Sequence, residues 1–126
     1  MADESITPGK KNEAGAPGLH IVAKPIGPAC NFDCAYCFYL EKQALFDAGK
    51  DCLMTDEVLA AFIRGYVEAQ STPVVDFVWQ GGEPTLLGID FFRRVVELQR
   101  PFARRKTITN VLQTNGTLLV MNGADF

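Results

Sequence analysis

The order of apolar segments along the chain constrains its fold more than any other feature of the sequence. Short runs rich in β-branched and aromatic residues predict strands over residues 19–23, 74–79 and 107–112. Longer runs with apolar residues at helical spacing predict helices over residues 56–70 and 89–103. Strands that alternate with helices favour right-handed βαβ units around a parallel sheet. The sequence therefore predicts an α/β fold.

Local signals place the ends of these elements. Thr55 is a suitable N-cap for the first long helix, and Asp56 and Glu57 follow in the first turn, where the helix dipole favours acidic side chains. The inward stripe of this helix is predicted to be Leu59, Phe62, Ile63, Tyr66 and Val67. A short helix is expected from Leu40 to about Ala48. Residues 1–18 are polar and contain several prolines and glycines, so we expect a flexible tail followed by one folded part, residues 19–126.

Each predicted strand is followed by an unusual loop. Cys30 to Tyr39 follows the first strand, Gln80 to Pro84 the second, and Gln113 to Gly116 the third. In parallel sheets, ligands collect beyond the carboxyl ends of the strands. Chain order alone therefore predicts that the three loops converge on one site.

Three of the four cysteines, Cys30, Cys34 and Cys37, have the spacing C-x3-C-x2-C. Thiolates gathered this closely are soft ligands for iron–sulfur clusters or zinc. Four cysteines usually hold a [4Fe–4S] cluster, so three would leave one iron open to a small molecule. Half of a zinc site or a redox pair at Cys34 and Cys37 remains an alternative. Cys52 could be a fourth ligand, but a packed or idle thiol is favoured.

Composition excludes several classes of function. The chain has 126 residues, 48% of them hydrophobic, which suits one domain with a real core. A net charge of −3 gives no broad case for binding nucleic acid or an anionic membrane, and the arginines of residues 93–106 fit a solvated helix face. No apolar run approaches the roughly 20 residues of a membrane span. The N-terminus has no signal-peptide pattern, so we expect a cytoplasmic protein with reduced thiols.

The Gly81-Gly82-Glu83-Pro84 run suits close approach of the backbone to a ligand, because glycine has no side chain to intervene. Free amides and carbonyls there could hold an amino or carboxylate group. Without the cysteines, the same four residues would be an ordinary turn between a strand and a helix.

These motifs together resemble those of the radical S-adenosylmethionine (radical SAM) enzymes. Over roughly residues 20–120, the runs Cys-Asn-Phe-Asp-Cys-Ala-Tyr-Cys-Phe-Tyr-Leu-Glu-Lys, Phe-Val-Trp-Gln-Gly-Gly-Glu-Pro-Thr-Leu and Leu-Gln-Thr-Asn-Gly-Thr-Leu-Leu are similar to those of anaerobic sulfatase-maturating enzymes. The resemblance implies the N-terminal βαβαβ part of a partial (β/α)6 barrel. The later strands, a proposed base and the auxiliary-cluster cysteines of that family have no counterpart here, so we expect a truncated core domain that is inactive by itself.

The resemblance also implies the cofactors and the roles of individual residues. A [4Fe–4S] cluster would bind the three cysteines, and S-adenosylmethionine would chelate the open iron and be split to a 5′-deoxyadenosyl radical. The set implied to contact S-adenosylmethionine is Tyr36, Gly81, Gly82, Glu83 and Asn115. Tyr39 and Gln80 match positions on the substrate side.

The implied reaction oxidises a cysteine or serine of an unfolded sulfatase peptide to Cα-formylglycine. A reductant such as flavodoxin or ferredoxin would supply electrons, and neither nucleic acid nor a membrane would be a partner. Two alternatives stay open: another peptide-modifying radical SAM enzyme, and a non-catalytic module that binds zinc or a cluster.

Overall fold

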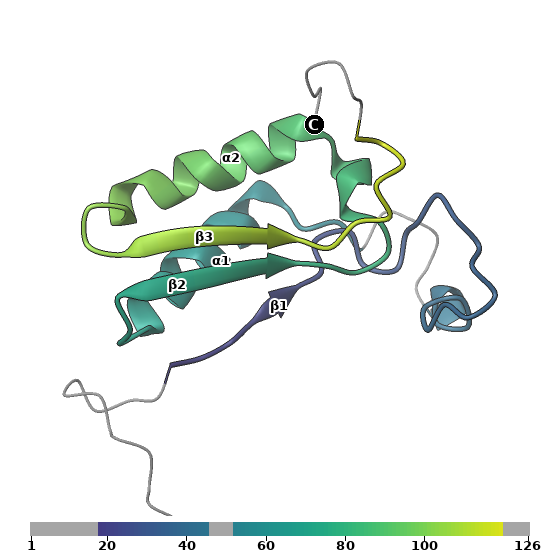
Figure 1. The fold of residues 1–126 in the computed structure, drawn as a ribbon, viewed down its shortest axis with the longest axis horizontal. Helices are drawn as coiled ribbons and strands as arrows, with labels where there is room; N and C mark the ends of the chain where they lie inside the picture. The colour runs from purple at the N-terminus through teal and green to yellow at the C-terminus, as the bar shows by residue number, and fades with distance from the viewer. Residues whose placement is uncertain (1–17, 46–51, 120–126) are drawn as a thin grey trace, which may run out of the picture.

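Three strands form one parallel sheet in the order β1-β2-β3. The computed structural model describes residues 18–45 and 52–119 (Figure 1). β1 comprises Val22–Ala23, β2 Val74–Trp79 and β3 Thr107–Leu112. The predicted α/β class, the parallel sheet and the bounds of β2 and β3 are therefore confirmed.

The first strand is shorter than the predicted residues 19–23, because side chains near the end of α1 (Asp56–Ala69) form hydrogen bonds with the backbone of Leu19. The Leu19 N–H donates to Gln70 Oε1 over 2.9 Å. The Leu19 carbonyl accepts from Gln70 Nε2 at 2.7 Å and from the Tyr66 hydroxyl at 3.1 Å. These bonds replace the ladder that a longer strand would make with β2.

Helix α1 comprises Asp56–Ala69 and matches its prediction to within one residue. Thr55 is its N-cap, as predicted, and the Thr55 Oγ1 accepts from the Val58 N–H over 3.3 Å. Four residues of the predicted stripe are buried, and the fifth, Phe62, packs against them.

Helix α2 comprises Ile89–Gln99 and ends earlier than the predicted residue 103, since Pro101 cannot continue the hydrogen bonding of an α-helix. A 3-10 turn, η3 (Arg100–Phe102), takes its place, and another, η2 (Pro84–Leu87), precedes α2. Of the short helix expected between residues 40 and 48, the structure has a 3-10 turn, η1 (Gln43–Leu45), and residues 46–51 lie outside the described part.

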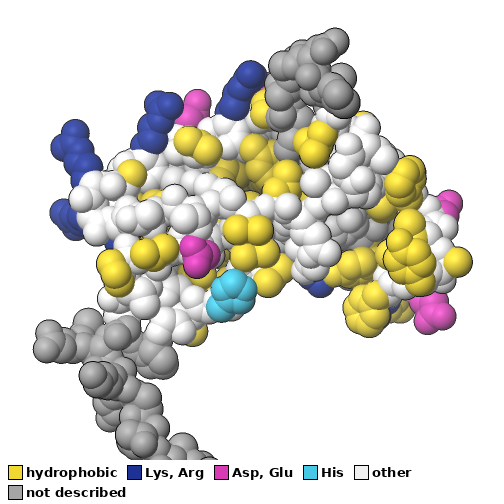
Figure 2. Space-filling view, viewed as in Figure 1, with side chains coloured by type: hydrophobic (Ala, Val, Ile, Leu, Met, Phe, Trp, Pro, Cys, Tyr) yellow, Lys and Arg dark blue, Asp and Glu magenta, His cyan; other side chains and the backbone are white. Residues whose placement is uncertain are grey.

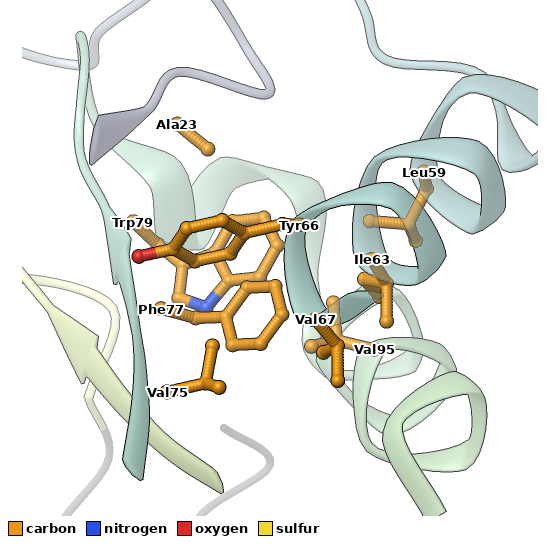
Figure 3. Packing of buried hydrophobic residues seen from close by; sticks show 9 residues of the cluster. All are labelled: Ala23, Leu59, Ile63, Tyr66, Val67, Val75, Phe77, Trp79 and Val95. Carbon is orange, nitrogen blue, oxygen red and sulfur yellow. The ribbon is translucent and has the colours of Figure 1, made fainter. Parts of the chain in front are cut away.

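Both long helices cover the same face of the sheet, and the core lies between them and β2 (Figures 1 and 3). The side chains of β2 alternate, so Val75, Phe77 and Trp79 are buried while Val74 and Asp76 are exposed. The buried cluster consists of Ala23, Leu59, Ile63, Tyr66, Val67, Val75, Phe77, Trp79 and Val95. Among the described residues, no helix is both long and apolar enough to cross a bilayer.

The register brings the three strands to the same level at one edge of the sheet. Ala23 and Leu112 both pair with Trp79. The ladder continues one residue further on each side, where the Gln80 N–H donates to the Ala23 carbonyl over 2.9 Å and the Gln113 N–H donates to the Trp79 carbonyl over 3.0 Å. The loops that follow the strands therefore start beside one another.

Candidate functional site

The three loops enclose one cavity of about 350 Å³ at the carboxyl edge of the sheet, here called the strand-end cavity. Its walls are three cysteines and four aromatic residues of residues 30–39 (the cysteine loop), Gly81 to Glu83, and Gln113 to Asn115. Chain order predicted this convergence. Of the predicted site residues, only Gln80 is absent from the wall; its side-chain amide donates instead to Gln113 Oε1.

The cysteine loop presents three free thiols to this cavity. Cys30, Cys34 and Cys37 are all half-buried, and none is in a disulfide. A tight turn, closed by the Cys37 N–H and the Cys34 carbonyl at 2.8 Å, joins the last two. Within residues 18–45 and 52–119, no three His, Cys, Asp or Glu side chains are grouped to hold a single metal ion. The donor set is three sulfurs around one cavity, which is chemistry suited to iron–sulfur ligation.

Gly81 and Gly82 approach the chain itself closely. A methyl carbon on Gly82 would lie 1.7 Å from the Ala29 carbonyl oxygen, and one on Gly81 would lie 2.9 Å from the Gly27 carbonyl oxygen. The Glu83 N–H donates to that Ala29 carbonyl over 2.7 Å. The glycine pair thus packs against the backbone immediately before Cys30. The sequence interpretation, which considered a ligand or an ordinary turn, missed this reason for glycine.

The Glu83 side chain is 1% exposed and joins the second loop to the third. Its Oε1 accepts from Thr85 Oγ1 at 2.6 Å, from the Thr85 N–H at 3.2 Å and from Thr114 Oγ1 at 2.5 Å. Its Oε2 accepts from the Asn115 N–H at 2.8 Å. Burial favours the neutral acid, but these donors, led by the Asn115 N–H, outweigh it and lower the pKa of Glu83 below 4.5.

This lowered pKa predicts acid sensitivity. A carboxyl whose folded pKa is depressed stabilises the fold above its unfolded pKa, and that contribution is lost as the pH falls through the folded pKa. As the pH is lowered below 4.5, we therefore expect the free energy of unfolding to decrease. The decrease should be smaller in Glu83→Gln. Urea unfolding at several pH values, followed by fluorescence of the single tryptophan, Trp79, measures the difference. Asp56, whose pKa is lowered by Arg94, contributes to both proteins, so equal slopes would contradict the assignment.

Aromatic side chains of the cysteine loop form the outer rim of the strand-end cavity. Tyr36 is 92% exposed and Phe38 is 68% exposed, and Figure 2 shows hydrophobic side chains gathered at the end of the molecule where this loop lies. Tyr39 is half-buried, and the Lys24 Nζ lies 4.7 Å from the centre of its ring. The Lys42 Nζ lies 3.4 Å from the centre of the Phe38 ring, so the rim is an apolar surface with lysine cations beside two of its rings.

Several contacts of the site gave no signal in the sequence. Ala29 and Asn31 contact predicted residues of other loops, Glu83 and Asn115 respectively. Asn31 Nδ2 also donates to Thr117 Oγ1 over 2.9 Å, across 86 residues. Asn31 and Thr114 lie within loops that sequence analysis had singled out, whereas Ala29 and Thr117 lie just outside them.

The family profile of the radical SAM superfamily matches residues 25–122 of this chain. This stretch contains all three strand-end loops, and the chain therefore belongs to the radical SAM superfamily.

Within that superfamily, the chain is similar to anaerobic sulfatase-maturating enzymes. It is 43% identical over 108 residues to a serine-type enzyme of Bacteroides thetaiotaomicron, which covers 86% of this chain and 26% of the relative. It is 38% identical over 111 residues to a cysteine-type enzyme of Clostridium perfringens, covering 87% of this chain and 30% of the relative. The chain thus spans between a quarter and a third of the length of these relatives.

Solved structures agree with this likeness. The structure of native anSMEcpe with bound AdoMet and Cp18Cys peptide superimposes with a TM-score of 0.68 at 38% identity, over 82% of this chain and 26% of that chain. The structure of native anSMEcpe with bound AdoMet gives a TM-score of 0.67 at 39% identity. The predicted radical SAM fold and the resemblance to sulfatase-maturating enzymes are confirmed.

Proposed function

We propose that the chain carries the part of a radical enzyme that binds S-adenosylmethionine and the cluster, and that the whole enzyme oxidises a sulfatase cysteine or serine to Cα-formylglycine. The observation that carries the proposal is the strand-end cavity, in which three free thiols face the glycine-rich loop of β2. The full-length relatives are named for sulfatase maturation, and a related structure holds both AdoMet and a peptide.

Cys30, Cys34 and Cys37 would hold a [4Fe–4S] cluster. When bound, the cluster would supply the electron that splits the S-adenosylmethionine sulfonium and yields a 5′-deoxyadenosyl radical. A reductant such as flavodoxin or ferredoxin would reduce the cluster. The role of the chain would be to supply three sulfur ligands at one cavity, so that a cluster bound there has fewer protein ligands than irons.

The second and third loops would hold S-adenosylmethionine. Gly81 and Gly82 would bind its amino end through backbone atoms, and Glu83 would add negative charge beside that amino group. The backbone of Tyr36, which lies on the cavity wall, would face the adenine, and Asn115 completes the contact set. Because Glu83 is already held by four protein donors, its charge is in place before a ligand binds.

Tyr39 and Gln80 would contact the substrate peptide. Tyr39 lies on the cavity wall, and Gln80 lies one residue beyond β2, paired with Gln113. The aromatic rim suits an extended peptide because it offers apolar contact beside hydrogen-bonding amides.

Anaerobic reconstitution with iron and sulfide tests the ligand set. We expect the Cys34→Ala variant to lose the cluster, since two thiolates cannot hold it in place of three. The measurement is iron and sulfide per chain, together with the visible absorption of the cluster.

The matched control is Cys52→Ala, because Cys52 is also a free, half-buried thiol but does not line the cavity. This control should retain the iron of the wild type. Full cluster content in Cys34→Ala, or a colourless zinc-loaded wild type, would refute the proposed ligands. Once the cluster forms, aldehyde gained by a sulfatase peptide incubated with S-adenosylmethionine and a reductant would support the sulfatase target over another peptide.

A further inference from the structure

Two nitrogen donors lie within hydrogen-bonding distance of the Cys30 sulfur, which sets it apart from the sulfurs of Cys34 and Cys37. The Phe32 N–H lies 3.4 Å from Cys30 Sγ, within the cysteine loop itself. The Asn115 Nδ2 lies 3.9 Å from the same sulfur and comes from the loop after β3, 85 residues away. Among the described residues, Cys30 is thus the cysteine at which two loops meet.

The orientation of the Asn115 amide is fixed by its other partners. Its Oδ1 accepts from the Thr117 N–H at 3.1 Å and from Thr117 Oγ1 at 2.8 Å. Its Nδ2 donates to Asn31 Oδ1 over 2.9 Å. A flipped amide would turn Nδ2 toward the Thr117 N–H, so the NH₂ group must face Cys30.

The backbone of Asn115 is fixed as well. Its N–H donates to Glu83 Oε2, on a carboxylate that is buried and bound to Thr85 and Thr114. Glu83 in turn is tied through its own N–H to Ala29, the residue before Cys30. Glu83 therefore binds both the backbone of Asn115 and the residue before Cys30. These two bonds fix the distance between the Asn115 amide and the Cys30 sulfur.

We propose that Asn115 is a positioning residue that donates a hydrogen bond to the Cys30 thiolate and thereby raises the reduction potential of the bound cluster. A donor to a ligating sulfur withdraws electron density and stabilises the reduced, more negatively charged form. The inference rests on the proposed function, because it needs the cluster at Cys30. It goes beyond that function by assigning a redox role to a residue outside the cysteine motif.

The test is the midpoint potential of the reconstituted protein without S-adenosylmethionine, from an anaerobic titration followed by electron paramagnetic resonance. Asn115→Leu removes the donor, and Asn115→Asp keeps the acceptor for Thr117 but replaces the NH₂ group with an anionic oxygen. We expect a lower potential in both variants, with the larger drop in Asn115→Asp. Exchange into D₂O should also show coupled deuterons from the Asn115 amide and from the Phe32 N–H, and Asn115→Leu should lose the first and keep the second.

The matched control is Asn31→Ala, which removes the partner of Asn115 across the two loops but leaves Thr117 to orient the amide. Because Asn31 Oδ1 also lies 4.0 Å from Cys30 Sγ, the potential of this variant should stay closer to the wild-type value than that of Asn115→Leu, without having to equal it. An unchanged potential in both Asn115 variants at full iron content would overturn the inference and leave the proposed function intact. A drop in Asn31→Ala equal to that in Asn115→Leu would also overturn it, because loop packing would then be the cause. A wild-type protein that takes up no cluster would overturn both.

Discussion

Replacing Gly82 with alanine is expected to destabilise the protein by about 3 kcal/mol, the upper end of the usual cost of overpacking. The added methyl would lie 1.7 Å from the Ala29 carbonyl oxygen, and a backbone atom cannot rotate away as a side chain can. The Ala29 carbonyl would have to move, which breaks its hydrogen bond with the Glu83 N–H. Urea unfolding followed by Trp79 fluorescence measures the loss.

Gly65 supplies the matched control for this prediction. It lies inside α1, and a methyl there would have no neighbour within 4 Å. Gly65→Ala should therefore stabilise the protein by about 0.5–1 kcal/mol, because alanine is the better helix former. Gly82 does not have a positive φ, so strain in the backbone dihedral plays no part. Equal stability of Gly82→Ala and the wild type would contradict the close approach of the two loops.

The second large effect is expected for Glu83→Ala, which should lower the free energy of unfolding by about 3 kcal/mol. Removing a buried carboxylate leaves its donors without an acceptor, and hydrogen bonds to a charged group are stronger than neutral ones. The Thr85 and Thr114 hydroxyls can rotate toward other acceptors, but the N–H groups of Thr85 and Asn115 are fixed by the backbone. The measurement is the same urea titration.

Glu97→Ala is the control for Glu83→Ala. Glu97 is 57% exposed on α2, where it pairs with Arg94 over 3.4 Å, and exposed pairs contribute less than about 1 kcal/mol. Glu83→Gln should fall between the two, since it keeps one acceptor and loses the charge. A Glu83→Ala protein as stable as Glu97→Ala would show that the carboxylate does not join the loops.

Local patterns predicted most of the fold because they follow directly from geometry. Alternation in β2 and helical spacing in α1 depend on neighbours within a few residues, and both elements match the prediction. The first strand was predicted too long because its apolar run cannot show that Gln70, 51 residues away, takes the Leu19 backbone. The second long helix was extended past Pro101 for a different, local reason: its apolar pattern continues to Phe102, and the stop signal of the proline was not used.

In the candidate site, too, local features were predicted from the sequence and long-range contacts were not. Cysteine spacing and chain order were enough to predict the loops and their convergence on one cavity. The partners of Glu83 in the third loop, and the Asn31–Asn115 pair, join residues more than 30 positions apart and have no periodic signature. The close contact between Gly82 and Ala29 could not be predicted from the sequence either. It depends on the register of β1 and β2, which determines where the two following loops meet.

The most direct test of the account is the effect of S-adenosylmethionine on the electron paramagnetic resonance spectrum of the reduced, reconstituted protein. We predict a [4Fe–4S] signal whose g-values shift when S-adenosylmethionine is added, because a cluster held by only three cysteines would leave one iron free to bind its amino and carboxylate groups. A cluster spectrum that S-adenosylmethionine leaves unchanged would contradict the central claim that the strand-end cavity holds both cofactors together.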